Sequence, residues 1–232
     1  NGDYLPGIDL PSNLCATSDV AVALAGAEQI YIAIPSQSLR ASLTEWAPMI
    51  DPQAILVSLM KGVEKESGLR MSEVIASVAN IDSDRIAVIS GPNLALEIAA
   101  GQPTASVAAS SNKETAAKVA ATATNDYFTT FTNRDVIGTE FGGILKNLIA
   151  VAIGIVNGVG YGENTKASIM TRGLSEISRF AVAYGAKEKT MVGLAGLGDL
   201  IATCESPLSR NHKAGEMLGK GYSKREVLKR MS

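Results

Sequence analysis

Ala54-Ile55-Leu56-Val57-Ser58-Leu59 is a short, almost wholly apolar run that gives way to Lys61-Gly62. Its apolar residues are continuous rather than alternating, which predicts a strand buried on both faces of a parallel sheet. Two similar runs and two weaker extended ones occur elsewhere before residue 134. The five predicted strands cover residues 29–34, 54–59, 86–89, 104–108 and 127–132.

Segments with helix formers and polar starts lie next to these runs, as crossover helices should. Repeated strand–helix units predict an open α/β sheet with right-handed crossovers. The predicted helices of this part cover residues 18–24, 38–46, 67–78 and 114–122.

After Asn133 no strand pattern remains, and long helical patterns take over. We therefore expect an α/β domain over residues 1–133 and an all-helical domain over residues 134–232. The helices predicted in the second part cover residues 136–157, 165–184, 197–203, 211–218 and 223–231.

Composition narrows the class of protein. The 232 residues carry 21 basic and 23 acidic side chains, so the formal charge of -2 offers no electrostatic footprint for nucleic acid. Cys15 and Cys204 lie far apart, which suits a reducing compartment. A single histidine, His212, makes a multi-histidine metal site impossible. The longest apolar run, residues 148–156, is shorter than the roughly 20 residues of a membrane span. We expect a cytoplasmic protein without a metal, nucleic-acid or membrane partner.

Unusual residues follow three consecutive predicted strands: Pro35-Ser36, Lys61-Gly62 and Ser90-Gly91-Pro92-Asn93. Ligands of open parallel sheets bind beyond the carboxyl ends of the strands, where loop amides converge. The three turns together favour a ligand cleft, although each alone fits an ordinary strand-to-helix turn. Lys61 by itself equally fits a lysine that reaches solvent along its apolar stem.

The predicted helix 136–157 is apolar on most sides and carries one lysine, Lys146. Such a helix should be central in its domain, so Lys146 either escapes through a cleft or is paired. The alternative is that glycines allow a close helix contact and Lys146 lies at the edge of that contact. Small and polar residues form the stripe beside it: Glu140, Gly143, Asn147, Ala150, Gly154 and Asn157.

A third cluster begins with Ala195-Gly196-Leu197-Gly198-Asp199 and continues through Thr203. Asp199 suits the role of counter-ion for a buried lysine. Ser209 can cap the next helix, whose start with Arg210 and Asn211 resembles a phosphate site. A lone histidine beside two basic residues is typical of a surface, so His212 is expected there.

Together these segments resemble the bacterial type of NAD(P)-dependent glycerol-3-phosphate dehydrogenase. The resemblance covers nearly the whole chain in order and spacing. It is carried by Tyr4-Leu5-Pro6-Gly7, Ile34-Pro35-Ser36, Lys61-Gly62-Val63-Glu64, Ile89-Ser90-Gly91-Pro92, Gly142-Gly143-Ile144-Leu145-Lys146-Asn147, Thr171-Arg172-Gly173-Leu174-Ser175-Glu176, Ala195-Gly196-Leu197-Gly198-Asp199-Leu200 and Ser209-Arg210-Asn211.

The resemblance implies a partial Rossmann-type dinucleotide-binding domain over residues 1–133 and a helical substrate-binding, catalytic domain over residues 134–232. It implies hydride transfer between sn-glycerol 3-phosphate and NAD or NADP, giving dihydroxyacetone phosphate and supplying glycerophospholipid synthesis. A homodimer is also expected.

The resemblance further implies roles for single residues. Lys146 would accept the proton of the 2-hydroxyl, and Lys61 and Asp199 would complete the catalytic set. We expect the two lysines, Asp199 and the start of the helix at Arg210 to share one crevice. Substrate contacts are implied for Lys61, Gly91, Asn93, Asn147, Asp199, Thr203, Ser209, Arg210 and Asn211. Cofactor contacts are implied for Pro35, Ser36, Lys61, Ala95 and Arg210.

The sequence departs from the family in two ways. Asn93 stands where a small hydroxyl residue is usual, and no Gly-x-Gly-x-x-Gly fingerprint precedes a helix. We therefore expect an internal portion of the enzyme, without the first βαβ unit, the residue that distinguishes NAD from NADP, or the C-terminal end. Two alternatives remain open: a truncated, non-catalytic binding or assembly module, and a related two-domain dehydrogenase of another phosphorylated or acidic substrate.

Overall fold

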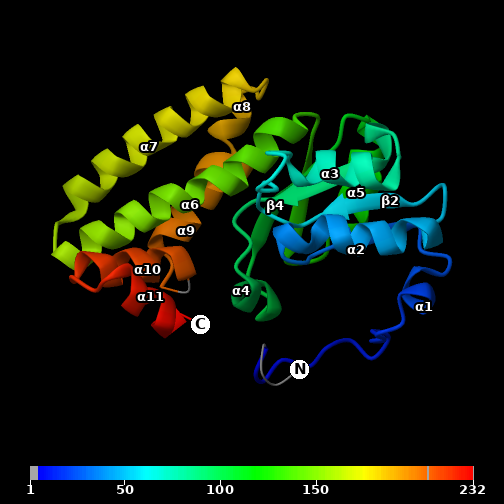
Figure 1. Ribbon diagram of the computed structural model, residues 1–232, viewed down its shortest axis with the longest axis horizontal. Helices are drawn as coiled ribbons and strands as arrows, with labels where there is room; N and C mark the ends of the chain where they lie inside the picture. Colours follow the sequence, from blue (N-terminus) through cyan, green and yellow to red (C-terminus); the bar gives the residue numbers. More distant parts are fainter. Residues whose placement is uncertain (1–4, 208, 232) are drawn as a thin grey trace. The chain divides into compact units, whose positions relative to one another are not determined.

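The computed structural model describes residues 5–207 and 209–231, so Tyr4 of the first motif lies outside the described residues. The chain divides into two compact units (Figure 1). The sheet unit comprises the described part of residues 1–89 together with residues 93–136. The helical unit comprises residues 90–92 and the described part of residues 137–232.

The sheet unit contains five strands in the order β1-β2-β3-β4-β5. The pairs β1–β2, β2–β3 and β4–β5 are parallel. The hydroxyl of Ser110, just after β4, donates to the carbonyl of Ile86 at the start of β3 (2.7 Å), so these two strands run in opposite directions. The sheet is therefore mostly parallel. The strands are β1 Gln29–Ile32, β2 Ile55–Ser58, β3 Ile86–Ser90, β4 Thr104–Ala109 and β5 Phe128–Asn133.

Two helices of this unit, α1 and α5, begin at polar side chains that accept from free backbone N–H groups. Asp19 accepts from the amides of Ala21 and Val22, and Asn112 caps α5 in the same way. The helices are α1 Val20–Leu24, α2 Leu39–Trp46, α3 Met71–Ala79, α4 Ala95–Ala99 and α5 Lys113–Ala123, with 3₁₀ turns η1 Ser36–Ser38, η2 Ala47–Met49 and η3 Ser83–Arg85.

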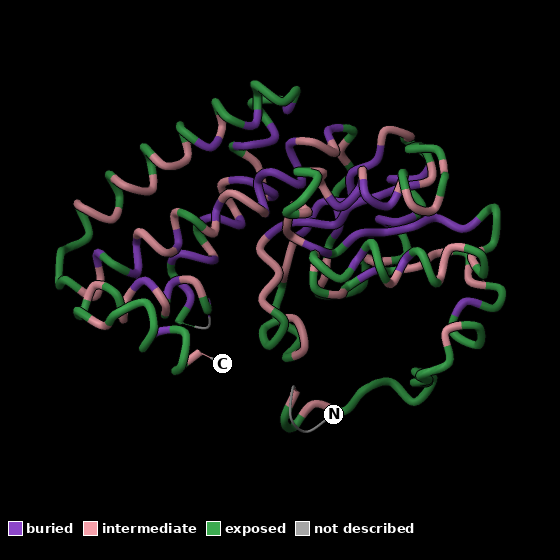
Figure 2. Tube along the Cα trace, in the orientation of Figure 1, coloured by how far each residue is buried: buried purple, intermediate pink, exposed green. Residues whose placement is uncertain are grey.

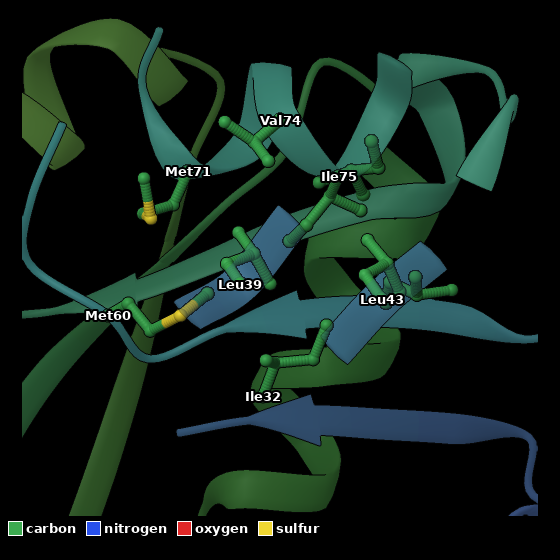
Figure 3. Packing of buried hydrophobic residues seen from close by; sticks show 9 residues of the cluster. Ile32, Leu39, Leu43, Met60, Met71, Val74 and Ile75 are labelled. Carbon is green, nitrogen blue, oxygen red and sulfur yellow. The ribbon is translucent and has the colours of Figure 1, made fainter. Parts of the chain in front are cut away.

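Two apolar clusters hold the sheet unit together. Leu39, Leu43 and Ile75 from α2 and α3 pack with Ile32 of β1 (Figure 3). Leu56 of β2 belongs to the same cluster. A second cluster joins Val119 of α5 to the alternate residues of the strands. Burying one leucine contributes about 1.5–3 kcal/mol to the stability of the folded state. Because strand residues belong to both clusters, this packing also holds the strands, whose ends carry the predicted site residues. β2 and β3 are buried throughout, as the continuous apolar runs predicted (Figure 2).

One predicted helix start is wrong. Residues 67–70 do not belong to α3, because the chain after β2 first forms a loop. Val63 and Arg70 pair in an antiparallel bridge, and Gly68 adopts a φ of 70°, which a helix cannot accommodate. Other predicted ends differ by a few residues, as helix ends commonly do.

The helical unit is built around α6, whose residues reach two apolar clusters. Phe141 packs with Ile177 and Met191, while Ile153 packs with Leu200 and Cys204. No strand occurs among the described residues from 137 onward. The helices are α6 Val136–Val159, α7 Glu163–Ala183, α8 Glu188–Met191, α9 Asp199–Glu205, α10 Arg210–Gly219 and α11 Lys224–Met231, with a π-helical turn, η4, at Leu194–Gly198.

Glycines let α10 lie directly against α6. A Cβ at Gly154 would collide with the carbonyl oxygen of His212, and one at Gly158 would collide with the backbone near Gly219. The stripe is therefore a close helix contact around Gly154, which agrees with the glycine part of the alternative interpretation; the place of Lys146 is a separate matter. The same crossing positions the start of α10, where Arg210 and Asn211 lie.

Within the described part of the chain, α6 is the one helix long and apolar enough to cross a membrane by length and composition. A core helix passes the same test. Its packing on two apolar clusters and its buried lysine, described next, are those of a core helix.

Candidate active site

Lys146 lies on the central helix α6 and is only 7% exposed. Its ammonium donates to the carboxylate of Asp199 and to the hydroxyl oxygen of Thr203, the latter at 2.6 Å. Asp199 is 1% exposed. A buried charge of this kind needs both a counter-ion and hydrogen bonds, and α9 supplies both. Of the interpretations of Lys146, the paired one is correct.

α9 presents the two partners of Lys146 from a single turn. Asp199 and Thr203 are four residues apart, and the Thr203 hydroxyl donates to the Asp199 carbonyl at 2.7 Å. The segment before α9 approaches α6 closely, because a Cβ at Gly142 would collide with the carbonyl of Ala195. The glycines of both motifs thus have a packing function that brings Asp199 to Lys146.

A second polar contact joins α6 to the start of α10. Asn211 donates from Nδ2 to the Oδ1 of Asn147 at 2.8 Å. Ser209 caps α10, accepting from the His212 amide at 3.2 Å. The exposed Arg210 donates to the Met231 carbonyl at 2.9 Å. Asn147 follows Lys146 directly, so the predicted phosphate-binding turn is tied to the residue beside the lysine.

Apart from Gly91, which belongs to the helical unit, the sheet unit holds the other predicted site residues. Lys61 and Asn93 line one pocket together with Tyr31, Leu59 and Phe128. Asn93 donates to the Ser106 hydroxyl at 3.1 Å. Its Oδ1 is buried and finds no hydrogen-bond partner among the described residues. Asn93 thus lines this pocket and carries a buried acceptor without a partner among the described residues.

The remaining predicted cofactor residues lie at strand and helix ends. Pro35 and Ser36 follow β1, and a Cβ at Gly62 would lie 2.6 Å from the Ser36 hydroxyl oxygen. The turns at 35–36 and 61–62 are thus in contact. Ala95 begins α4 and is exposed. Gly91, a predicted substrate residue, has a φ of 150°, which favours glycine.

The structure brings together Lys146, Asp199 and Thr203, and separately Asn147 and Asn211. The approach of Lys61 to Lys146 stays a prediction, as do the roles of all these residues. Among the described residues, no group of three or more His, Cys, Asp or Glu side chains is placed to hold a metal ion.

His212 is not a surface residue, contrary to expectation. It is 8% exposed, and its Nε2 lies 2.6 Å from the Nδ2 of Asn157. The spacing of His212 from Gly215 and Gly219 places all three on the glycine face of α10, a signal that composition alone does not give.

Comparison with known proteins agrees with these features. A model described as the N-terminus of NAD-dependent glycerol-3-phosphate dehydrogenase matches residues 1–116, and the corresponding C-terminal model matches residues 135–232. A relative from Leifsonia xyli subsp. xyli, named glycerol-3-phosphate dehydrogenase (NAD(P)+), is 64% identical over 231 residues. The alignment covers 100% of this chain and 63% of that relative.

Two further matches are similar in kind. The relative of the same name from Corynebacterium glutamicum strain R is 57% identical, covering 96% of this chain and 67% of its own length. The crystal structure of glycerol-3-phosphate dehydrogenase from Coxiella burnetii superposes with a TM-score of 0.93 at 38% identity. The superposition includes 100% of this chain and 70% of the chain from Coxiella burnetii. The chain belongs to the NAD-dependent glycerol-3-phosphate dehydrogenase family.

Proposed function

We propose that the protein carrying this chain is an oxidoreductase that interconverts sn-glycerol 3-phosphate and dihydroxyacetone phosphate with NAD or NADP. The chain spans 63% of the length of its relative from Leifsonia xyli, so the activity is assigned to the longer protein. The names of its relatives and the family membership support this assignment. The product would supply glycerophospholipid synthesis.

The buried Lys146–Asp199–Thr203 cluster is the observation that carries the proposal. Oxidation of a secondary alcohol removes a hydride from the carbon and a proton from the hydroxyl. The Lys146 ammonium first loses one proton to solvent. The neutral Nζ then accepts the hydroxyl proton, and Asp199 stabilises the ammonium that forms again. In the reverse direction the ammonium polarises the ketone and returns the proton. Thr203 fixes the direction of Nζ through its hydroxyl oxygen.

The start of α10 suits the phosphate of the substrate. Free N–H groups and the helix dipole favour an anion at this end, and Ser209, Arg210 and Asn211 add polar side chains. Asn147 holds Asn211 through the 2.8 Å hydrogen bond. In this proposal the start of α10 would hold the phosphate of the substrate, and Lys146 of α6 would contact its reacting hydroxyl.

The residues of the sheet unit suit a dinucleotide. The buried Oδ1 of Asn93, without a partner among the described residues, accepts from a carboxamide or hydroxyl group, and Lys61 in the same pocket complements negative charge. Pro35, Ser36 and Ala95 of the same unit would complete the contacts, and the cofactor contact of Arg210, at the start of α10, stays a prediction. When bound, the nicotinamide supplies the hydride chemistry that protein side chains lack.

The test uses the purified full-length protein. NADH or NADPH consumption with dihydroxyacetone phosphate is followed at saturating cofactor, with 6-phosphogluconate tested as the competing substrate in the oxidative direction. Turnover of dihydroxyacetone phosphate supports the proposal. Turnover of the other substrate alone would favour a related dehydrogenase. Absence of both turnover and NADH binding by calorimetry would favour a binding module.

We further propose that the protein is cytoplasmic and homodimeric and contacts neither nucleic acid nor membrane. The near balance of charge argues against a nucleic-acid partner, and the two free cysteines support a reducing compartment. Exposed apolar residues on α6, such as Leu148 and Ile155, support the dimer. Light scattering of the full-length protein after gel filtration tests the dimer, and a monomeric mass would overturn it.

A further inference from the structure

The segment after β2 is a closed loop with Lys61 at its start; residues 61–70 are called the lysine loop below. Val63 and Arg70 pair across it in an antiparallel bridge. The Glu64 amide donates to the Leu69 carbonyl, and the Gly68 amide donates to the Glu64 carbonyl, both at 2.9 Å. The lysine loop is thus held to itself by backbone hydrogen bonds.

The side chain of Gln37 binds this loop through hydrogen bonds. Gln37, in η1, donates from Nε2 to the Val63 carbonyl at 2.8 Å, and its Oε1 accepts from the Lys65 amide at 3.1 Å. The amide group therefore bonds the loop backbone on both sides of Glu64. Both functions of the amide are used, so no other side chain of this length replaces it fully.

A second contact with the loop comes from α2, one helical turn after Gln37. Arg40 donates from Nε and from a terminal nitrogen to the two oxygens of Glu64, each at 2.8 Å. Such a paired arrangement fixes direction as well as distance. The Ser67 hydroxyl also donates to Glu64, at 2.5 Å. The Glu64 side chain is only 14% exposed, whereas that of Arg40 is 45% exposed.

The contact at the base of the loop leaves no free space. A Cβ at Gly62 would lie 2.6 Å from the Ser36 hydroxyl oxygen. Lys61 is therefore held on one side by β2 and on the other by a loop that touches the turn at 35–36 and is bonded to Gln37 and Arg40.

We propose that Gln37 and Arg40 are positioning residues that hold Lys61 in its working place through the lysine loop. The inference rests on the proposed function, in which Lys61 contacts substrate and cofactor. Lysine has a long, flexible side chain, so its reach is only as well defined as its backbone. A displacement of about 1 Å at a reacting group can cost roughly 100-fold in rate.

The test compares full-length variants in pairs. Gln37→Ala and Arg40→Ala should each lower kcat/KM by roughly tenfold. The double variant Arg40→Glu with Glu64→Arg should restore part of the loss. Matched controls are Gln53→Ala, which removes an exposed glutamine of the same unit, and Arg179→Ala, which breaks the exposed Arg179–Glu176 ion pair on α7. Both controls should stay within about twofold of the unmodified protein.

The decisive comparison is made in a Lys61→Ala background. If Gln37 and Arg40 act through Lys61, their removal costs nothing further once Lys61 is gone, because effects of residues that act as a unit are not additive. Equal losses with and without Lys61 would overturn the proposal, since they indicate a general structural role. Unchanged kcat/KM in both single variants would overturn it too.

A second measurement does not depend on activity. Lysines are labelled by reductive ¹³C-methylation, and the Lys61 signal is identified by its absence in Lys61→Arg. The proposal predicts that Gln37→Ala shifts this signal toward that of exposed lysines, while Gln53→Ala leaves it in place. An unmoved Lys61 signal would contradict the proposal. Loss of the proposed dehydrogenase activity in the unmodified protein would not affect this measurement.

Discussion

Lys146 and Asp199 form a buried ion pair between α6 and α9, across 53 residues of sequence. With 7% and 1% exposure, neither charge has water to replace its partner. Removal of one member of such a pair typically costs about 3–5 kcal/mol of stability, because the other charge is left uncompensated. The same pair has to gain and lose a proton in the proposed reaction, so stability and catalysis depend on the same two groups.

Thr203→Val should slow the reaction without unfolding the protein. Valine matches the shape of threonine but cannot accept from Lys146 or donate to the Asp199 carbonyl. Loss of these hydrogen bonds should cost about 1–3 kcal/mol of stability and lower kcat by roughly tenfold. Thr203→Ser keeps the hydroxyl and serves as the control. Steady-state kinetics and urea unfolding measure both effects, and equal activity of the two variants would contradict the role of the hydroxyl.

Gly154→Ala should push α10 away from α6. The added methyl group meets the carbonyl oxygen of His212, which is backbone and cannot give way easily. Overpacking of this kind costs about 1–3 kcal/mol. The KM for the phosphorylated substrate should rise, because α10 carries Arg210 and Asn211. Gly162→Ser is the control, since nothing lies within 4 Å of a Cβ there. An unchanged KM in Gly154→Ala would contradict the prediction that the contact between α6 and α10 positions the substrate-binding residues of α10.

The two cysteines should react differently with iodoacetamide. Burial raises the pKa of the Cys204 thiol from 9.0 to about 12, with Glu205 adding to the effect and Lys146 opposing it. At pH 8 the native thiol is therefore protonated and also covered, whereas Cys15 is exposed. Mass spectrometry should find label on Cys15 in the native protein and on both cysteines in urea. Rapid native labelling of Cys204 would refute its place in the core beside Thr203.

Glu64 should remain ionised far into the acid range. Hydrogen bonds from Arg40 and then Ser67 lower the pKa of its carboxyl from 4.5 to about 2. Because the folded pKa is lowered, the contribution of this contact is complete above about pH 4.5 and is lost as the pH falls through about 2. A ¹³C-detected titration should show no change in Glu64 between pH 7 and 5, and Arg40→Ala should raise its midpoint. An ordinary midpoint in the unmodified protein would contradict the Arg40–Glu64 contact.

Local sequence patterns were sufficient for most of the fold. The continuous apolar runs at 54–59 and 86–89 became the fully buried strands β2 and β3. The apolar helix around Lys146 proved central in its unit, with the lysine paired as one interpretation required. Both results follow from one rule: a helix or strand that is apolar on several faces is packed against other elements on those faces.

Contacts between distant residues were less accessible from the sequence. His212 was expected on the surface because its neighbours are basic, yet the glycine face of α10 buries it against Asn157. The start of α3 was placed too early, because the bridge between Val63 and Arg70 depends on pairing that no helical periodicity reports. The fastening of the lysine loop by Gln37 could not be predicted either, since an exposed glutamine carries no pattern of its own.

Single-turnover hydride transfer in Lys146→Arg tests the central claim most directly. Arginine keeps the positive charge beside Asp199, so the fold should survive, but it cannot give up its proton. With substrate and cofactor saturating, the full-length variant should transfer hydride roughly 10²–10⁴-fold more slowly than the unmodified protein, and Lys166→Arg on α7 should not differ from it. Hydride transfer in Lys146→Arg at the rate of the unmodified protein would contradict the assignment of Lys146 as the group that carries the proton.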